Sequence, residues 1–179
     1  MTSPTEAPGV SRADTGRSRR VLIVAAATLV VAVDQLSKWL VVTHLHLGDT
    51  VRVCSFLQLK YTHNSGMAFG LWARGGKALP ALAALCIVAL LIWGSRYARQ
   101  SPLVGWALAL VVGGALGNMI DRVRLGHVTD FIDLSFWPVF NFADACVVVG
   151  AFLLLWHTLR RPDEPPPVES SAAAAEDDA

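Results

Sequence analysis

The stretch Gly113-Gly114-Ala115-Leu116-Gly117-Asn118-Met119-Ile120-Asp121-Arg122 places small, amide and charged residues at the end of an apolar run. The run begins at Pro102 and is close to the roughly 20 residues that an α-helix needs to cross a bilayer. Helix packing alone explains the glycines, since small residues let another helix approach closely. It does not explain the polar cluster, because polar groups in a membrane span are costly and usually have a partner and a use.

Three further apolar runs predict an all-α membrane protein with four transmembrane helices. The expected spans cover residues 21–42, 78–95, 102–120 and 139–159. Basic residues precede the first run as in a secretory signal, but the run is long and no good cleavage site follows, so we interpret it as a retained span. Residues 1–20 and 162–179 are rich in Ser, Pro, Ala and charge. We expect these two tails to be disordered and cytoplasmic, around a membrane domain at 21–161.

The composition agrees with a membrane protein. Of the 179 residues, 54% are hydrophobic and 16% are charged, against roughly 25% charged residues in soluble domains. Only six of the 14 acids fall between residues 21 and 161, and these are Asp34, Asp49, Asp121, Asp130, Asp133 and Asp144. A soluble enzyme would carry more acids on its surface. The pattern argues against a nucleic-acid binder, a disordered chain and a disulfide scaffold, and the three cysteines show neither pairing nor metal-ligand spacing.

Lys and Arg in the connecting segments set the expected orientation, because cytoplasmic loops are enriched in these residues. The short connection 96–101 contains Arg96 and Arg99. We therefore expect both termini in the cytoplasm and the segment 43–77 outside the membrane.

The segment 43–77 is too long for a tight turn. Within it, Val51 and Val53, then Leu57, Leu59 and Tyr61, alternate with other residues. This period of two is typical of a half-buried strand. We expect a small extracytoplasmic β element of two or three strands, whereas the later segment His127 to Asp133 is interpreted as an outer loop.

Two polar positions in the first span form a local pair. Asp34 and Lys38 lie one helical turn apart, so their side chains share one face of the helix. The favoured interpretation is a structural ion pair that holds this helix against its neighbours.

Asp130 and Asp144 are the candidates for chemistry. Asp130 lies among apolar residues in the outer loop, while we assign Asp133 to solvent. With a helix starting at residue 139, Asp144 would lie roughly 7 to 8 Å below its outer end. Two carboxylates held together in a poorly solvated place share one proton near neutral pH, so one can activate water while the other binds a carbonyl oxygen. No metal or other cofactor is required.

These residues resemble the lipoprotein signal peptidases, or signal peptidase II, of bacteria. The resemblance covers about 34–150 and rests on five motifs in order: Asp34-Gln35-x-Ser37-Lys38, Asn64-Ser65-Gly66-Met67-Ala68-Phe69-Gly70, the stretch 113–122, Val128-Thr129-Asp130-Phe131, and Phe140-Asn141-Phe142-Ala143-Asp144. Any one motif is weak, but five in order with four spans are highly specific.

The resemblance implies a membrane aspartyl endopeptidase of the bacterial plasma membrane. Such an enzyme cleaves prolipoproteins just before a cysteine that already carries a diacylglyceryl group. Its catalytic aspartates correspond to Asp130 and Asp144. The matching cleft and supporting positions are Asn64, Asn118, Asp121, Arg122, Asn141, Asp34 and Lys38. The expected partners are lipid-modified prolipoproteins, membrane lipid and cyclic peptide inhibitors, with no nucleic acid.

Two other classes remain open at this level. A small ion or proton transporter would use Asp34, Lys38, Asp121 and Asp144 as a path, but it would need polar groups across the full depth of the bundle. A membrane anchor subunit would use the polar groups only to join helices. The second span has polar groups only at its ends and the inner halves of the other spans lack acids, which disfavours the transporter. The anchor does not explain an acid in each of two adjacent motifs at the outer face.

Overall fold

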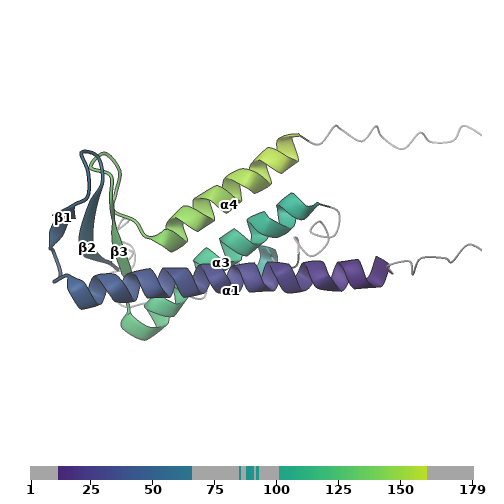
Figure 1. Ribbon diagram of the computed structural model, residues 1–179, viewed down its shortest axis with the longest axis horizontal. Helices are drawn as coiled ribbons and strands as arrows, with labels where there is room; N and C mark the ends of the chain where they lie inside the picture. Colours follow the sequence, from purple (N-terminus) through teal and green to yellow (C-terminus); the bar gives the residue numbers. More distant parts are fainter. Residues whose placement is uncertain (1–11, 66–84, 86–87, 91, 93–100, 161–179) are drawn as a thin grey trace, which may run out of the picture.

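The computed structural model describes residues 12–65, 85, 88–90, 92 and 101–160. In chain order its elements are α1 (Arg12–His44), β1 (Thr50–Arg52), β2 (Gln58–Asn64), α3 (Pro102–Leu125), β3 (Val128–Asp133) and α4 (Phe142–Leu159). Figure 1 shows the strands gathered at one end of the long helices, with the start of α1 and the end of α4 at the opposite end.

Three helices among the described residues are long and apolar enough to cross a membrane, namely Gly16–His44, Pro102–Leu125 and Phe142–Leu159. They match the first, third and fourth expected spans. The expected span at 78–95 falls mostly outside the described residues, although the described positions 85, 88–90 and 92 are helical. The structure therefore confirms a helical membrane protein with a small sheet.

Two helix starts differ from the sequence-based boundaries. The helix α1 begins at Arg12 instead of residue 21, so part of the stretch expected to be disordered is helical. No proline interrupts residues 12–20, and a helix once formed extends easily into such a stretch. The helix α4 begins at Phe142 instead of 139, because Phe140 pairs with Ile132 and Asn141 caps the helix.

The helix α3 packs against both α1 and α4, and its glycines permit the close approach. A Cβ atom on Gly114 would overlap the backbone carbonyl oxygen of Ala143 in α4. A Cβ on Gly117 would lie 2.5 Å from the Asp34 carboxylate in α1. The small residues of the 113–122 stretch therefore bring three helices and their polar side chains together.

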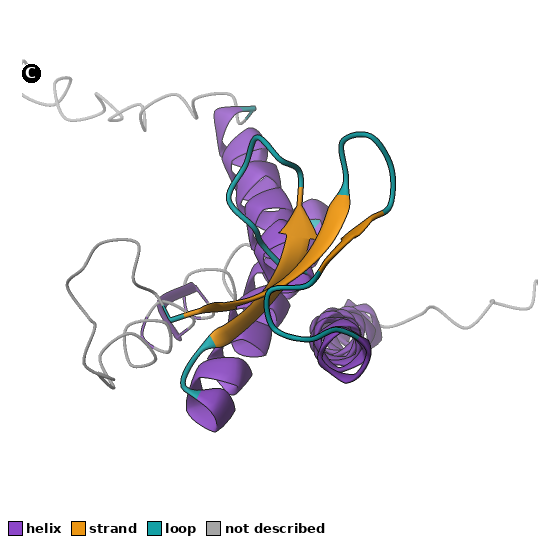
Figure 2. Ribbon diagram, turned by 90° about the vertical axis from the view of Figure 1, so that its left-hand side faces the viewer, coloured by secondary structure: helices purple, strands orange, loops and turns teal. Residues whose placement is uncertain are grey.

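The strands form one antiparallel sheet in the order β1-β2-β3. Figure 2 shows this sheet crossing the ends of the helices. The expected outer loop at 127–133 is thus wrong, since Val128–Asp133 is a strand paired with β2. Its first four residues are all buried, so they lack the polar-apolar alternation that identifies a strand in sequence. Tyr61, Phe131 and Val41 pack together and attach the sheet to α1.

The contact between Gly114 and α4 predicts a large effect from one methyl group. We expect Gly114→Ala to lower the stability of the detergent-solubilised protein by about 1–3 kcal/mol, because the added carbon forces α3 away from α4. Thermal unfolding monitored by circular dichroism measures the change. Gly16→Ala is the matched control, because a Cβ there meets nothing within 4 Å. Equal melting temperatures for the Gly114 variant and the parent would contradict this packing.

Candidate active site

Asp130 lies on the central part of β3 and is 1% exposed. Two amide groups donate to its carboxylate: Asn64 Nδ2 to Oδ2 at 2.9 Å, and Asn141 Nδ2 to Oδ1 at 2.7 Å. The sheet register explains the first contact, because Thr62 pairs with Asp130 and Asn64 therefore lies two residues further along the same face of β2. Strand pairing thus places Asn64, a predicted cleft residue, beside Asp130, a predicted catalytic residue.

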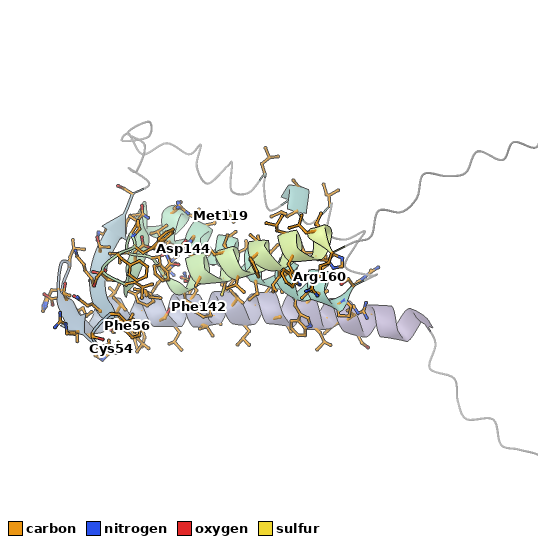
Figure 3. All side chains as sticks on the ribbon, turned by 90° about the horizontal axis from the view of Figure 1, so that it is seen from above. Cys54, Phe56, Met119, Phe142, Asp144 and Arg160 are labelled. Carbon is orange, nitrogen blue, oxygen red and sulfur yellow. The ribbon has the colours of Figure 1, made fainter. Side chains whose placement is uncertain are left out.

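Asp144 lies in the first turn of α4. The expected helix start at residue 139 would place it more than one turn below the outer end of the helix. Asn141 and Asp144 form a reciprocal cap at this helix start. The Asn141 side chain accepts from the Asp144 backbone N–H at 2.9 Å, and the Asp144 carboxylate accepts from the Asn141 backbone N–H at 3.3 Å. Figure 3 shows Asp144 near the sheet end of α4 and Arg160 near its other end. Asp144 is therefore half-buried at the junction of helix and sheet.

Asn141 joins the two carboxylates, because it donates to Asp130 through its side chain and to Asp144 through its backbone. Burial raises the pKa of the Asp130 carboxyl above its ordinary value, and the negative charge of Asp144 raises this pKa further. The structure therefore brings the two predicted aspartates close enough to influence each other's charge.

A second polar cluster lies beside this pair, and Lys38 is at its centre. The Lys38 ammonium nitrogen lies 2.8 Å from Asp34 Oδ2 and 2.9 Å from Asp121 Oδ2. It also donates to Asn118 Oδ1 at 2.9 Å. The predicted Asp34–Lys38 pair is confirmed, and Asp121 from α3 is a third member that helical spacing within α1 does not indicate.

The same Asn118 connects this cluster to the carboxylate pair. Its Nδ2 donates to Asp144 Oδ1 at 2.7 Å, and its Oδ1 also accepts from Asn141 Nδ2 at 3.0 Å. Arg122 donates through Nη1 to the backbone carbonyl of Asn118 at 3.4 Å. All nine predicted site residues therefore belong to one connected polar network, with Arg122 attached through the backbone of its own helix.

Gln35 is a member of this network that the sequence-based site did not include. Its Nε2 lies 2.9 Å from Asp121 Oδ1, and it also contacts Asp34 Oδ2 and the Gly117 carbonyl, each at 3.2 Å. The available signal was its position beside Asp34 in the first motif. Backbone groups complete the cluster, because Ala143 N–H donates to Asp34 and Thr129 N–H donates to Asp121. Residues 66–70 of the second motif lie outside the described residues.

Two histidines next to this site were also not singled out. His63 and His127 stack with their ring centres 3.6 Å apart, and Tyr61 Oη lies 2.9 Å from His63 Nε2. Burial, followed by the neighbouring His127, lowers the pKa of His63. A neutral imidazole therefore occupies the strand position next to Asn64 at neutral pH.

Comparisons with known proteins agree with this geometry. The family described as Signal peptidase (SPase) II matches residues 26–160. The lipoprotein signal peptidase of Moorella thermoacetica is 43% identical over 134 residues, which cover 74% of this chain and 89% of that protein. The lipoprotein signal peptidase of Coxiella burnetii (strain RSA 331 / Henzerling II) is 40% identical over 144 residues, covering 76% and 88%. A solved bacterial membrane enzyme superposes with a TM-score of 0.74 at 30% identity, covering 79% of this chain and 94% of that one.

The apolar helices, the sheet at their end and the paired carboxylates define a membrane-embedded enzyme of the aspartyl protease class. The chain belongs to the signal peptidase II family. Membership in this family favours the peptidase interpretation and gives no support to the transporter.

The environment of Asp130 predicts a carboxyl group that keeps its proton above the ordinary aspartate value near 3.8. Infrared difference spectra recorded across a pH titration measure it through the C=O stretch of the protonated acid. We expect Asp130→Asn to remove a band that persists above that pH, and Asp144→Asn to lower its midpoint because the repelling charge is gone. Asp133→Asn serves as the control. A midpoint unchanged by Asp144→Asn would contradict the electrostatic coupling.

Proposed function

We propose that this chain removes the signal peptide from diacylglyceryl-modified prolipoproteins, cleaving just before the lipidated cysteine, with Asp130 and Asp144 as its catalytic pair. The observation that carries the proposal is the Asn141 side chain and backbone holding one aspartate each, where three membrane helices meet the sheet. The lipoprotein signal peptidases to which the chain is similar support the substrate class.

The two aspartates take different roles because their surroundings differ. Asp130 is buried beside a like charge, so it holds the shared proton and donates a hydrogen bond to the scissile carbonyl oxygen. Asp144 lies at the N-terminal end of α4, where the helix dipole and backbone N–H groups favour a negative charge. In its ionised form it removes a proton from the attacking water. The tetrahedral intermediate then breaks down as a carboxyl group protonates the leaving nitrogen.

The three asparagines hold these carboxylates in position. Asn64 and Asn141 bind Asp130, and Asn118 binds Asp144. Bonds of 2.7–2.9 Å from amide groups limit the rotation of both acids, so the carboxyl oxygens are oriented before substrate arrives. Arg122, beside Asn118, is the proposed contact for peptide carbonyl groups of the substrate.

The position of the pair suits a substrate that is anchored in lipid. We propose four transmembrane helices in the bacterial plasma membrane, both termini in the cytoplasm and the sheet on the extracytoplasmic side. Large apolar side chains face outward along the helices, including Leu29, Leu36 and Phe152. A prolipoprotein can then approach sideways with its acyl chains in the bilayer, while its scissile bond meets water at the sheet end. A cyclic peptide that occupies this site would compete with substrate.

Removing either carboxylate tests the catalytic assignment. We expect Asp130→Asn and Asp144→Asn each to reduce signal-peptide release from purified diacylglyceryl-modified prolipoprotein by about 10²–10⁴-fold, because each removes a proton-transferring group. Asp133→Asn, on the same strand, should cleave at the parental rate. Near-parental turnover by either amide variant with a normal melting temperature would refute the pair, and equal cleavage of unlipidated precursor would refute the substrate.

Chemical labelling tests the proposed orientation. The test uses a background in which Cys54, Cys86 and Cys146 are replaced by serine. We expect Asp49→Cys in this background to react with a membrane-impermeant maleimide in intact spheroplasts. The matched Arg160→Cys should react only after the membrane is permeabilised, because it lies at the other end of the helices (Figure 3). The reverse labelling pattern would invert the orientation.

A further inference from the structure

Lys38 has a set of contacts that a simple ion pair does not need. Its side chain is buried between α1 and α3, with 4% of the residue exposed. An ammonium group has three hydrogens and no acceptor. All three hydrogens are accounted for by Asp34 Oδ2 at 2.8 Å, Asp121 Oδ2 at 2.9 Å and Asn118 Oδ1 at 2.9 Å. Two partners are carboxylates of opposite charge, but the third is a neutral amide that contacts Asp144.

The ammonium determines which way the Asn118 amide faces. Asn118 Oδ1 receives two donors, Lys38 Nζ and Asn141 Nδ2. A reversed amide would turn its NH₂ group toward these two donors and its oxygen toward the Asp144 carboxylate. Because Lys38 can only donate, the reversed orientation has no hydrogen bond to it. The NH₂ group of Asn118 therefore faces Asp144 Oδ1 at 2.7 Å.

The same polarity extends to Asn141. Its NH₂ group uses one hydrogen on Asn118 Oδ1 and the other on Asp130 Oδ1. Its own oxygen accepts from the Asp144 backbone N–H. A single donor-only group in α1 thus begins a chain of oriented amides that ends on both carboxylates, in β3 and α4.

We propose that Lys38 is a positioning residue for the peptidase reaction: it orients the Asn118 amide so that NH₂ groups face both catalytic aspartates. The proposal rests on the proposed function of Asp130 and Asp144. A hydrogen bond donated to a carboxylate favours its charged form, whereas an amide oxygen in the same place disfavours it. Among the described residues, the charged and titratable groups near Asp130 and Asp144 are Asp34 and Lys38 from α1, Asp121 and Arg122 from α3, and the stacked histidines His63 and His127.

A role for Lys38 that is limited to its charge makes a different prediction. Burial raises the pKa of Asp130 and the Lys38 charge acts against that rise, so a role limited to charge predicts that Lys38→Met shifts the pH profile equally in the parent and in an Asn118→Ala background. Positioning acts on the reactive pair, so it changes kcat and the pH at which the base becomes active. The comparison between the two backgrounds separates the two roles.

The experiment measures kcat, KM and the pH profile of kcat/KM on diacylglyceryl-modified prolipoprotein for the purified full chain and its variants. We expect Lys38→Met to lower kcat about 10²-fold with KM changed less than about 3-fold, because the lost orientation acts at the reacting groups. The acidic limb of the profile should move to higher pH, because the carboxylate pair loses a hydrogen bond that is donated to its charged form. Lys38→Arg, which keeps the charge and the donors, should restore the position of that limb.

Three further variants make the result decisive. Lys60→Met on β2 is the matched control and should behave as the parent. Lys38→Met together with Asp34→Asn removes one positive and one negative group, so it keeps the net charge of the cluster and limits the charge imbalance if the single variant fails to fold. The acidic limb should shift equally in this double variant. In an Asn118→Ala background, Lys38→Met should add no further shift, because the two residues act in series.

Opposite outcomes overturn the proposal. An unmoved acidic limb in the folded single or double variant, with a lower melting temperature, makes Lys38 purely structural. An additional shift in the Asn118→Ala background shows that Lys38 acts by another route. Failure of the proposed function is distinguishable, because Asp130→Asn or Asp144→Asn would then retain turnover, and that result would withdraw the basis for Lys38 as well.

Discussion

The interaction on which the rest of the site depends is the buried ammonium of Lys38 between the carboxylates of Asp34 and Asp121. Charged groups inside a bilayer are expensive, and a buried pair that loses one partner costs about 3–5 kcal/mol. The helices α1 and α3 must therefore stay in register for each charge to keep its partner. The Ala143 N–H adds α4 to the same cluster by donating to Asp34. One set of paired charges thus determines the relative positions of the three described spans.

The close packing of the helices also allows their polar side chains to form hydrogen bonds with one another. Gly117 leaves room for Asp34, and Gly114 leaves room for the α4 backbone at Ala143. Because α3 and α4 approach each other this closely, Asn141 at the start of α4 is within hydrogen-bond distance of Asn118 on α3 and Asp130 on β3. The sheet contributes Asn64 from the other side. Among the described residues, the carboxylates are consequently held by side chains from β2, α3 and α4, which suits the proton exchange proposed for them.

The parts of the fold that sequence reasoning predicted are those with a local signal. Apolar length identified the three spans that the described residues contain, and the i, i+4 spacing identified the Asp34–Lys38 pair. Strand β3 was missed because its first four residues are all buried, so its sequence does not alternate between polar and apolar residues. The predicted depth of Asp144 was wrong because Phe140 pairs with Ile132, so the helix begins only at Phe142. Gln35 was missed because its role depends on Asp121, 86 positions away. Each of these features depends on contacts distant in the chain.

Residue types and their spacing were enough to assign the class of the protein, since membrane spans and five ordered motifs depend on nothing else. They also indicated all nine residues of the predicted site. How these residues connect is visible only in three dimensions: Lys38 contacts three side chains from two helices, Asn118 faces Asp144, and Asn141 donates to both aspartates. The direction of a hydrogen bond is a property of two groups in space, so no single residue specifies its partner.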